Sequence, residues 1–503
     1  MSASAGPPSP HLAPHVRAWL LLAALLLLLG FAFQGTRGLW SPDEGRFTGG
    51  AVQMLDSGHW LLPRYSPDQP NLSKPPLTYW LIAASVAAFG HDTWAVRAPY
   101  ALAYALTALL AALIAQPWMH RRAWLAGLVY GLALGPFLTA NIVSTDVFLA
   151  LFEALAMLGV SRALLQPAAR TRWLLLAGAG FGLGFLTKGP PALLPLLGML
   201  PYALRRGGWR AFAGLFAPAM LLPFLLLGAS WYVLIMLRLP GAAHTFLYRE
   251  VYERVFTATQ ERNPQWYGGF KVYLPFLLLA TLPWWPALGR PLRQLLRRDA
   301  WRRWWHEADP ALLLWPWVLL PLLVFFLARS RLPLYVLPLL LPLCLLAARQ
   351  IAPHVDLRRR GQRAALLLWV LLLLAIKASA ALYLPTRNDE RALATQLRAM
   401  TGTQHYAALL FAEDAHNAYQ REQRTPWGLD LYLRRPVYAV AWAMPTDRPR
   451  LCAALRTQGS LLVVAAASVA QPVRTTLRGC AASMQTLGTV RDHRVLLARA
   501  AAG

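Results

Sequence analysis

Two carboxylates and an arginine stand close together in the segment Trp40-Ser-Pro-Asp-Glu-Gly-Arg46. A carboxylate that is held near a reacting hydroxyl can act as a general base. The alternative is that Asp43 and Glu44 only favour the positive end of a helix. Their spacing alone does not separate these two interpretations.

The local pattern predicts that a short helix begins in this segment. Ser41 would be its N-cap, Pro42 its first residue and Glu44 the reciprocal partner in a capping box. Apolar side chains then recur on one face, as suits a helix that lies on a membrane surface: Phe47, Ala51 and Met54 or Leu55.

Two of only four lysines occur in matching contexts, Asn71-Leu-Ser-Lys74-Pro-Pro and Phe185-Leu-Thr-Lys188-Gly-Pro-Pro. Either lysine alone is explained by an ammonium group that reaches up to the lipid headgroups. On one face of a membrane, however, the pair forms the cationic cluster that a lipid-linked phosphate needs.

Further polar residues stand between apolar runs. Asp146, in Asn141-Ile-Val-Ser-Thr-Asp146, is a functional candidate because ionisable groups are costly at membrane depth, although it can also assist a helix N-terminus. Arg329, Arg331 and Tyr335 lie at another helix end, where an interfacial belt is the alternative. The glycines between 178 and 184 indicate close helix packing and not a phosphate-binding loop. We find no metal-binding or Ser/His/Asp motif.

Membrane helices must position these residues. The 503 residues are 57% hydrophobic and 14% charged, whereas soluble proteins carry about 25% charged residues. This composition excludes a soluble enzyme, a disordered chain and a fibrous one. Eleven runs can cross a bilayer, near 18–33, 98–117, 123–140, 147–165, 174–187, 190–204, 212–237, 273–289, 311–328, 333–348 and 364–383. No cleavage site follows the first run, which indicates an uncleaved helix. The shorter run 77–89 is predicted to be interfacial or re-entrant.

The charges orient this topology. With a cytoplasmic N-terminus, short cytoplasmic loops hold 19 arginines, and fewer basic residues are spread over the longer outer loops. The net charge of +27 therefore reflects topology, and we expect no nucleic-acid partner. Four stretches then face outward together with Lys188: 35–97, 141–146, 238–272 and 328–332.

The odd number of spans also places the tail outside. The sequence predicts two parts, a transmembrane domain over 1–384 and a small soluble α/β domain over 385–503. The tail alternates a helical pattern at 389–400 with strand patterns at 406–411, 437–440, 460–467 and 494–497. In an oxidising compartment Cys452 and Cys480 could pair. With three cysteines in all, the chain has no disulfide scaffold.

At these residues the chain resembles a known family. Asp-Glu-x-Arg, Gly58-His-Trp60 and Lys-Pro-Pro-Leu-x-Tyr-Trp are similar to motifs of the bacterial polyprenyl-phosphate-sugar glycosyltransferases. These include the lipid A 4-amino-4-deoxy-L-arabinose transferases and the protein O-mannosyltransferases. Thr145-Asp146, Thr187-Lys188-Gly189 and Arg331-Leu-Pro-x-Tyr335 extend the resemblance over about residues 18–350. It implies the all-α, polytopic GT-C fold, often with an outer C-terminal domain.

The resemblance also implies roles for single residues. Asp43 would be the principal catalytic carboxylate, and Asp146 a second carboxylate near the acceptor or the sugar. The donor phosphate would be bound by Arg46, Lys74 and Lys188. The walls of the same outer cavity would include Glu44, Arg331 and Tyr335.

The chain departs from the family pattern at two positions. The family commonly has Glu before Lys-Pro-Pro, where this chain has Ser73, and often Glu-His where it has Glu250-Val251. Because both changes remove metal-ligand types, we predict no bound metal and no cofactor. They also place an aminoarabinose substrate in doubt.

Together these features predict a multi-pass glycosyltransferase of the bacterial inner membrane, with its site and tail in the periplasm. It would move a hexose or pentose from a polyprenyl-phosphate donor to a lipid or glycan acceptor such as lipid A. A transporter or flippase is the alternative, but it predicts ionisable residues at the bilayer midplane and an internal repeat, which we do not find. A structural scaffold would leave the acidic first loop unexplained. The sequence names neither the sugar, the acceptor nor the oligomeric state.

Overall fold

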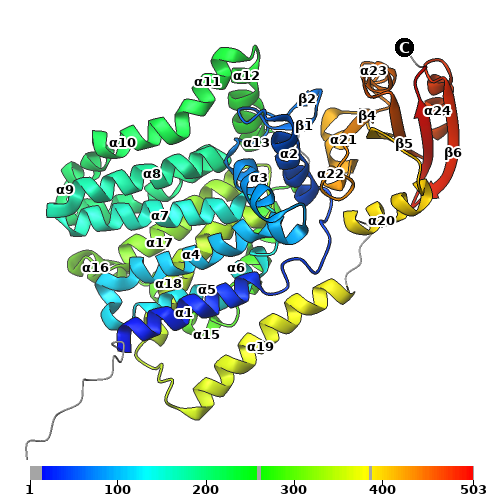
Figure 1. Ribbon diagram of the computed structural model, residues 1–503. Coiled ribbons are helices and arrows are strands. Elements are labelled where there is room, and N and C mark those ends of the chain that lie inside the picture. Colours follow the sequence, from blue (N-terminus) through cyan, green and yellow to red (C-terminus); the bar gives the residue numbers. More distant parts are fainter. Residues whose placement is uncertain (1–13, 258–261, 384–387, 502–503) are drawn as a thin grey trace, which may run out of the picture.

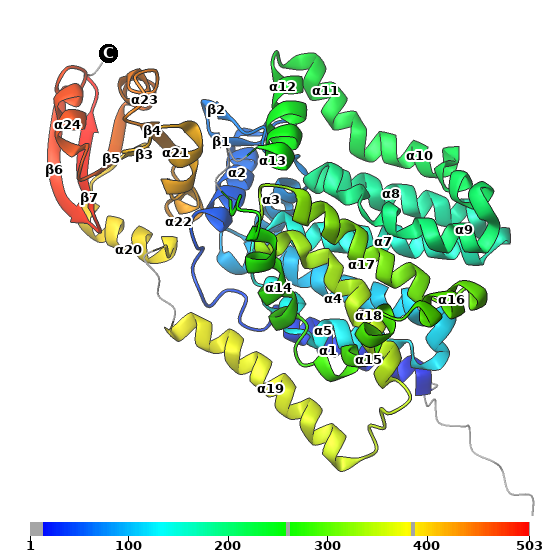
Figure 2. The same cartoon turned by 180° about the vertical axis from the view of Figure 1, so that it is seen from behind.

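The computed structural model describes residues 14–257, 262–383 and 388–501. A bundle of long helices forms one part of the molecule, and a sheet with flanking helices forms a smaller part beside one end of the bundle (Figure 1). The predicted boundary at residue 384 lies outside the described residues. Seen from behind, α19 (Arg360–Tyr383) runs along the edge of the bundle and leads toward the smaller part (Figure 2).

Helices occupy all eleven predicted membrane runs. In chain order they are α1 (Pro14–Phe31); α4 (Thr93–Met119); α5 (Trp124–Leu132) with α6 (Leu134–Thr139); α7 (Thr145–Leu165); α8 (Arg170–Lys188); η3 (Pro190–Leu193) with α9 (Pro195–Ala213); η4 (Gly214–Phe216), α10 (Pro218–Phe224), η5 (Leu225–Ala229) and α11 (Ser230–Arg238); α14 (Gly268–Ala280) with α15 (Trp285–Leu295); α17 (Ala311–Leu327); η7 (Pro333–Leu339) with α18 (Leu340–Ile351); and α19. Five helical stretches of the described chain are long and apolar enough to cross a membrane: Thr93–Arg122, Thr145–Leu165, Pro218–Arg238, Pro333–Ile351 and Arg360–Ala380.

Basic residues surround the short elements at the predicted cytoplasmic joints, which are η1 (His120–Arg122), η2 (Pro167–Ala169) and α16 (Arg298–Glu307). The first outer stretch contains α2 (Asp43–Ser57), β1 (Arg64–Ser66), β2 (Gln69–Pro70) and α3 (Leu77–Phe89). The third contains α12 (Ala242–His244), the π-helix η6 (Thr245–Tyr252) and α13 (Glu253–Phe256). With 13 residues, α3 is short for a membrane span.

Helices α7 and α8 form a tight antiparallel hairpin. A Cβ atom added at Gly180 would lie 2.5 Å from the backbone nitrogen of Ala156, and one added at Gly159 would lie 2.6 Å from that of Ala177. Close helix packing, which the glycines indicated, is therefore confirmed at Gly180. The hairpin brings the beginning of α7 beside the end of α8.

The predicted capping box in the first loop is wrong. Helix α2 begins at Asp43, its N-cap residue is Pro42, and no side chain caps it. The Ser41 hydroxyl donates to the Glu390 carboxylate in the C-terminal part, and the Trp40 backbone N–H donates to Glu44 Oε2 at 2.9 Å. For Ser41, a partner that is distant in the sequence has replaced the local one.

Helix α2 is also not a surface helix with one free face, because it is buried almost continuously from Glu44 to Met54. On one side the Phe47 ring packs on Tyr79 of α3, with centroids 5.5 Å apart. On the other side Gly49 faces the Trp427 carbonyl, which a Cβ atom would approach to 2.5 Å. The helix is enclosed between the bundle and the C-terminal domain.

The C-terminal domain is a five-stranded mixed sheet. The strand order is β4 (Val437–Ala441), β3 (Ala408–Glu413), β5 (Ser460–Ala466), β7 (His493–Arg499), β6 (Ser483–Val490). Strand β3 is parallel to both of its neighbours, and β7 is antiparallel to both of its neighbours. Its helices are α20 (Glu390–Thr401), α21 (Ala418–Arg424), α22 (Leu429–Leu433), α23 (Pro449–Gln458) and α24 (Ala470–Arg478). The predicted helix and all four predicted strands are confirmed, and β6 was missed because most of its side chains are exposed or half-buried.

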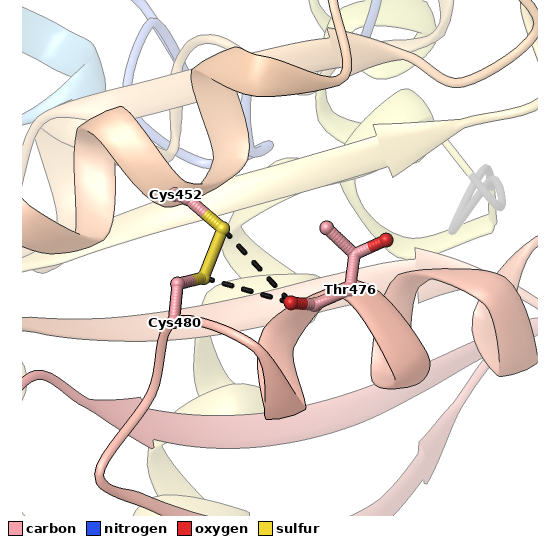
Figure 3. Close-up of a disulfide and its surroundings, with 3 residues drawn as sticks. All are labelled: Cys452, Thr476 and Cys480. Atoms are coloured by element: carbon pink, nitrogen blue, oxygen red, sulfur yellow. Dashed lines mark hydrogen bonds between the residues drawn. A yellow bond between two sulfur atoms is a disulfide. The ribbon is translucent and has the colours of Figure 1, made fainter.

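Cys452 on α23 and Cys480 just after α24 form a disulfide (Figure 3). Their sulfur atoms lie 4.0 and 3.7 Å from the Thr476 carbonyl oxygen. Cys344 in α18 is buried and free.

Candidate active site

The predicted outer stretches meet around one cavity of about 380 Å³, a typical size for a small-molecule site. Lys188 and two residues of the C-terminal helix α21 complete its walls. Most of the lining comes from residues 43–79, 142–146, 245–262 and 332–335. Six of the eight predicted site residues face it: Asp43, Arg46, Lys74, Asp146, Lys188 and Tyr335.

Asp43 and Arg46 stand one turn apart on α2 and form an ion pair. The Asp43 side chain is 59% exposed, whereas that of Arg46 is only 15% exposed. The Nε of Arg46 is buried and finds no hydrogen-bond partner in the described part of the chain. Asp43 is therefore open to the cavity, and the Nε–H group of Arg46 remains available to donate a hydrogen bond.

Asp146 and Lys188 form a second ion pair, which the α7–α8 hairpin creates by joining the two helix ends. The Ser144 hydroxyl also donates to Asp146 Oδ2 at 2.8 Å. The Lys188 ammonium lies 4.3 Å from the centroid of the Tyr335 ring, a distance at which the ring attracts a cation.

Lys74 is the third cation of the cavity. Its Nζ donates to the Ser73 carbonyl at 2.7 Å and lies 3.4 Å from Glu250 Oε2. Burial, with the nearby positive charge of Arg254, lowers the pKa of the Lys74 ammonium to about 7 against the opposing effect of Glu250. An anionic ligand would favour the protonated form.

Sequence reasoning did not place the charged residues of the third outer stretch in the site. Glu250 binds Lys74 and also Arg254 Nη2, at 2.6 Å. Burial acts to raise the pKa of Glu250, but Lys74 and Arg254 hold it below its ordinary value. Arg249 and Arg262 line the same cavity. The sequence did contain one indication of this pair. Glu250 and Arg254 are four residues apart, and side chains at this spacing lie on one face of a helix.

Glu44 lies behind the cavity wall, not on it. Arg37 donates to its two oxygens at 2.6 and 2.8 Å, Arg97 Nη2 donates at 2.9 Å, and the Val143 backbone N–H donates at 3.1 Å. Burial alone would raise the pKa of Glu44, but Arg97 and Arg37 outweigh it and lower the pKa to about 2. Glu44 thus fixes α2 against the turn that precedes Asp146.

Arg331 likewise does not face the cavity. Its Nη1 donates to the carbonyls of Asn263 and Gln265 at 2.8 and 2.7 Å, and its Nη2 donates to that of Phe326 at 2.9 Å. The guanidinium therefore holds the turn that follows Arg262.

An apolar groove of about 210 Å³ adjoins the polar cavity. The two share Lys74, Lys188, Glu250, Arg254 and Tyr335, with Leu72 and Ser73. Beyond these the groove is mainly apolar, with Pro190, Pro191, Leu194, Phe246, Val324 and Phe325. The two lysines therefore lie where the apolar groove joins the polar cavity. This arrangement suits an amphiphilic ligand with an anionic head group.

Comparison with known proteins identifies the family. The family model described as dolichyl-phosphate-mannose-protein mannosyltransferase matches residues 73–232. The undecaprenyl phosphate-α-4-amino-4-deoxy-L-arabinose arabinosyl transferase of Pseudomonas paraeruginosa is 35% identical over 390 residues, which cover 74% of this chain and 67% of that protein. This chain belongs to the bacterial polyprenyl-phosphate-sugar glycosyltransferases. The predicted family is thereby confirmed.

Several other members of this glycosyltransferase family match over less of their length. The corresponding enzyme of Sodalis glossinidius is 35% identical over 341 residues, or 66% of this chain, and the match spans 59% of that relative. The fold agrees more fully: the crystal structure of ArnT from Cupriavidus metallidurans bound to undecaprenyl phosphate superposes with a TM-score of 0.73 at 21% identity. It covers 97% of this chain and 99% of that one. The predicted GT-C fold, an all-α membrane protein with a small C-terminal domain, is confirmed.

Both departures from the family pattern are visible in the site. The Ser73 hydroxyl donates to Asn71 Oδ1 at 2.6 Å and lies 3.2 Å from the Tyr65 hydroxyl, and Val251 lines the apolar groove. Within the described ranges, no group of three or more His, Cys, Asp or Glu side chains is placed to hold a metal ion.

Proposed function

We propose that this glycosyltransferase takes a pentose, 4-amino-4-deoxy-L-arabinose, from undecaprenyl phosphate and transfers it to lipid A or a related envelope glycan. One observation carries the proposal: Lys74 and Lys188 stand together where the apolar groove meets the polar cavity. The names of the relatives supply the donor and the sugar.

The donor phosphate would lie between the two lysines, with Arg254 beside them. The polyprenyl chain would follow the apolar groove, and the sugar would enter the polar cavity. Cationic groups at this point stabilise the negative charge that grows on the phosphate as it leaves. Their charges make the lipid phosphate a better leaving group without a nucleotide.

Asp43 would act as the general base. Its carboxylate would take the proton from an acceptor hydroxyl, whose oxygen attacks the anomeric carbon as the bond to the phosphate oxygen breaks. Undecaprenyl phosphate leaves with the electron pair, and the sugar is transferred with inversion. If the acceptor is itself a phosphate, Asp43 would position it. Arg46 beside Asp43 would contact the donor phosphate, and Asp146, which is paired with Lys188, would face the acceptor or the sugar.

The protein would lie in the inner membrane with the cavity and the C-terminal domain in the periplasm. The arginine-rich short loops support this orientation. The Cys452–Cys480 disulfide supports it independently, because disulfides persist in oxidising compartments.

The test is reconstitution of the purified protein in lipid nanodiscs with the undecaprenyl-phosphate-linked amino sugar and lipid A. Mass spectrometry should find lipid A heavier by one aminoarabinose residue, together with free undecaprenyl phosphate. In sealed vesicles, donor that crosses the bilayer unchanged, without any product, would instead identify a flippase.

A further inference from the structure

The C-terminal domain contributes a carboxylate to the cavity. Helix α21 places Tyr419 and Glu422 on the wall that faces α2. The Tyr65 hydroxyl donates to Glu422 Oε2 at 3.1 Å, and the Tyr65 ring stacks on Trp427 with centroids 5.4 Å apart. Glu422 is therefore held in a defined position.

The charge of Glu422 is not neutralised by an ion pair with any of the described residues. Arg46, which lies nearby, is paired with Asp43, and Arg421 on the same helix is paired with Asp447. Burial raises the pKa of the Glu422 carboxyl, which Arg46 and the Tyr65 hydrogen bond only partly oppose. A cationic ligand group would relieve this cost, because an ion pair favours the charged carboxylate.

Glu422 also lies close to the phosphate site. Ser73, the neighbour of Lys74, has its hydroxyl 3.2 Å from the Tyr65 hydroxyl, which in turn binds Glu422. The Tyr65 hydroxyl, which contacts the Ser73 hydroxyl on one side and donates to Glu422 on the other, thus connects the residue before Lys74 with the carboxylate. A sugar on a phosphate at Lys74 would extend into the space between them.

We propose that Glu422 is the specificity residue for the amino group of the donor sugar, and that its carboxylate receives the sugar ammonium in a charge-assisted hydrogen bond. This inference rests on the proposed function, because it places the phosphate at Lys74. It assigns the C-terminal domain a part in substrate choice. It also supplies a counter-charge for an amino sugar in a cavity whose other charged residues are mostly basic.

The expected selectivity follows from the chemistry of the pair. A charge-assisted hydrogen bond is about twice as strong as a neutral one. A polar group that is built to bind a substrate amine discriminates against an analogue that lacks the charge, because the group is then left unpaired. The N-formyl derivative of the same sugar is neutral and adds only a formyl group at the nitrogen.

The test compares both donors in nanodiscs with the full-length protein. Glu422→Gln keeps the shape and the hydrogen bond from Tyr65 but removes the charge. It should lower kcat/KM for the amino-sugar donor by about tenfold or more, leave kcat/KM for the N-formyl donor nearly unchanged, and leave the affinity for undecaprenyl phosphate itself unaltered. Glu422→Asp should retain part of the preference.

Two further variants serve as controls. Asp414→Asn removes a carboxylate that lies in the same domain but outside the cavity, where its Oδ2 accepts a hydrogen bond from Ser468. This variant should leave kcat/KM unchanged for both donors. Tyr65→Phe removes only the hydroxyl that orients Glu422. It should lower the preference for the amino-sugar donor by a smaller factor than Glu422→Gln does.

Equal losses on both donors in Glu422→Gln would overturn the proposal and leave Glu422 with a structural role. An unchanged preference would also overturn it. Wild-type protein that transfers neither sugar would overturn the proposed function itself and this inference with it, which is a different result from a failure in the variant alone.

Discussion

Asp146 at the beginning of α7 and Lys188 at the end of α8 form an ion pair inside the cavity. The short η2 turn makes the two helices antiparallel, and the glycine contacts between them set how closely the ends approach. Neither charge is therefore an isolated interfacial group. The pair gives the cavity a fixed cation beside Tyr335, at the mouth of the apolar groove.

The two lysines of the groove should contribute directly to donor affinity. Replacing Lys74 or Lys188 by Met keeps the apolar stem and removes a charge-assisted contact of roughly 1.5–3 kcal/mol, so each change should weaken undecaprenyl-phosphate binding by about tenfold or more. Lys271→Met is the matched control, because this exposed lysine does not line the cavity. Binding measured by fluorescence or calorimetry should separate the three variants. Unchanged affinity in both cavity variants would mean that these lysines only reach the lipid headgroups.

Donor binding should depend on pH through Lys74. The pKa of its ammonium is lowered to about 7, so the charged form that binds a phosphate is lost as the pH rises through this value. Affinity for undecaprenyl phosphate should therefore fall between about pH 6 and about pH 8. This fall should be absent in Lys74→Met. A wild-type profile that stays flat over the same range would contradict this role.

Glu44 should matter for folding more than for chemistry. Glu44→Gln leaves Arg37 and Arg97 buried without their counter-charge, and breaking a buried pair in this way costs about 3–5 kcal/mol. Thermal unfolding in detergent should show a large loss of stability. Asp43→Asn, which changes the exposed member of its ion pair, should lower the unfolding temperature much less than Glu44→Gln does. Equal stability of all three proteins would exclude a structural role for Glu44.

Fusion reporters can test the orientation. A reporter attached after the C-terminal domain should be active as a periplasmic fusion, and one placed in α16 near Arg298 as a cytoplasmic fusion. The basis is the excess of arginines in the short loops and the odd number of predicted spans. Two fusions that report the same side would rule out the eleven-span topology.

The sequence predicted the helical segments and the convergence of the outer stretches well, because both depend on hydrophobicity and charge along the chain. Six of the eight candidate residues face one cavity for this reason. The capping box failed because Ser41 and Glu44 find stronger partners, Glu390 and Arg97, that are distant in the sequence. Local pattern carries no information about such pairs.

The contributions of the C-terminal domain could not be predicted. Tyr419 and Glu422 lie on a short helix, and only the docking of the domain on the first loop turns them toward the cavity. That docking depends on contacts such as Gln69 Nε2 with the Ala439 carbonyl, at 3.2 Å, and Arg450 with Asp68, at 2.5 Å. These contacts join segments that are far apart in the chain.

The most direct measurement is the rate of radiolabelled sugar transfer from undecaprenyl phosphate by wild-type protein and by Asp43→Asn, at equal amounts of folded, membrane-inserted protein. Asn is nearly isosteric with Asp but cannot take the proton, and loss of a general base typically costs 10²–10⁴-fold in rate. We expect the wild type to transfer label and the variant to fall by about that factor. A wild-type protein without transfer would contradict the proposed activity. A variant that retains more than about a third of wild-type turnover would remove Asp43 as the base and make Asp146 the better candidate.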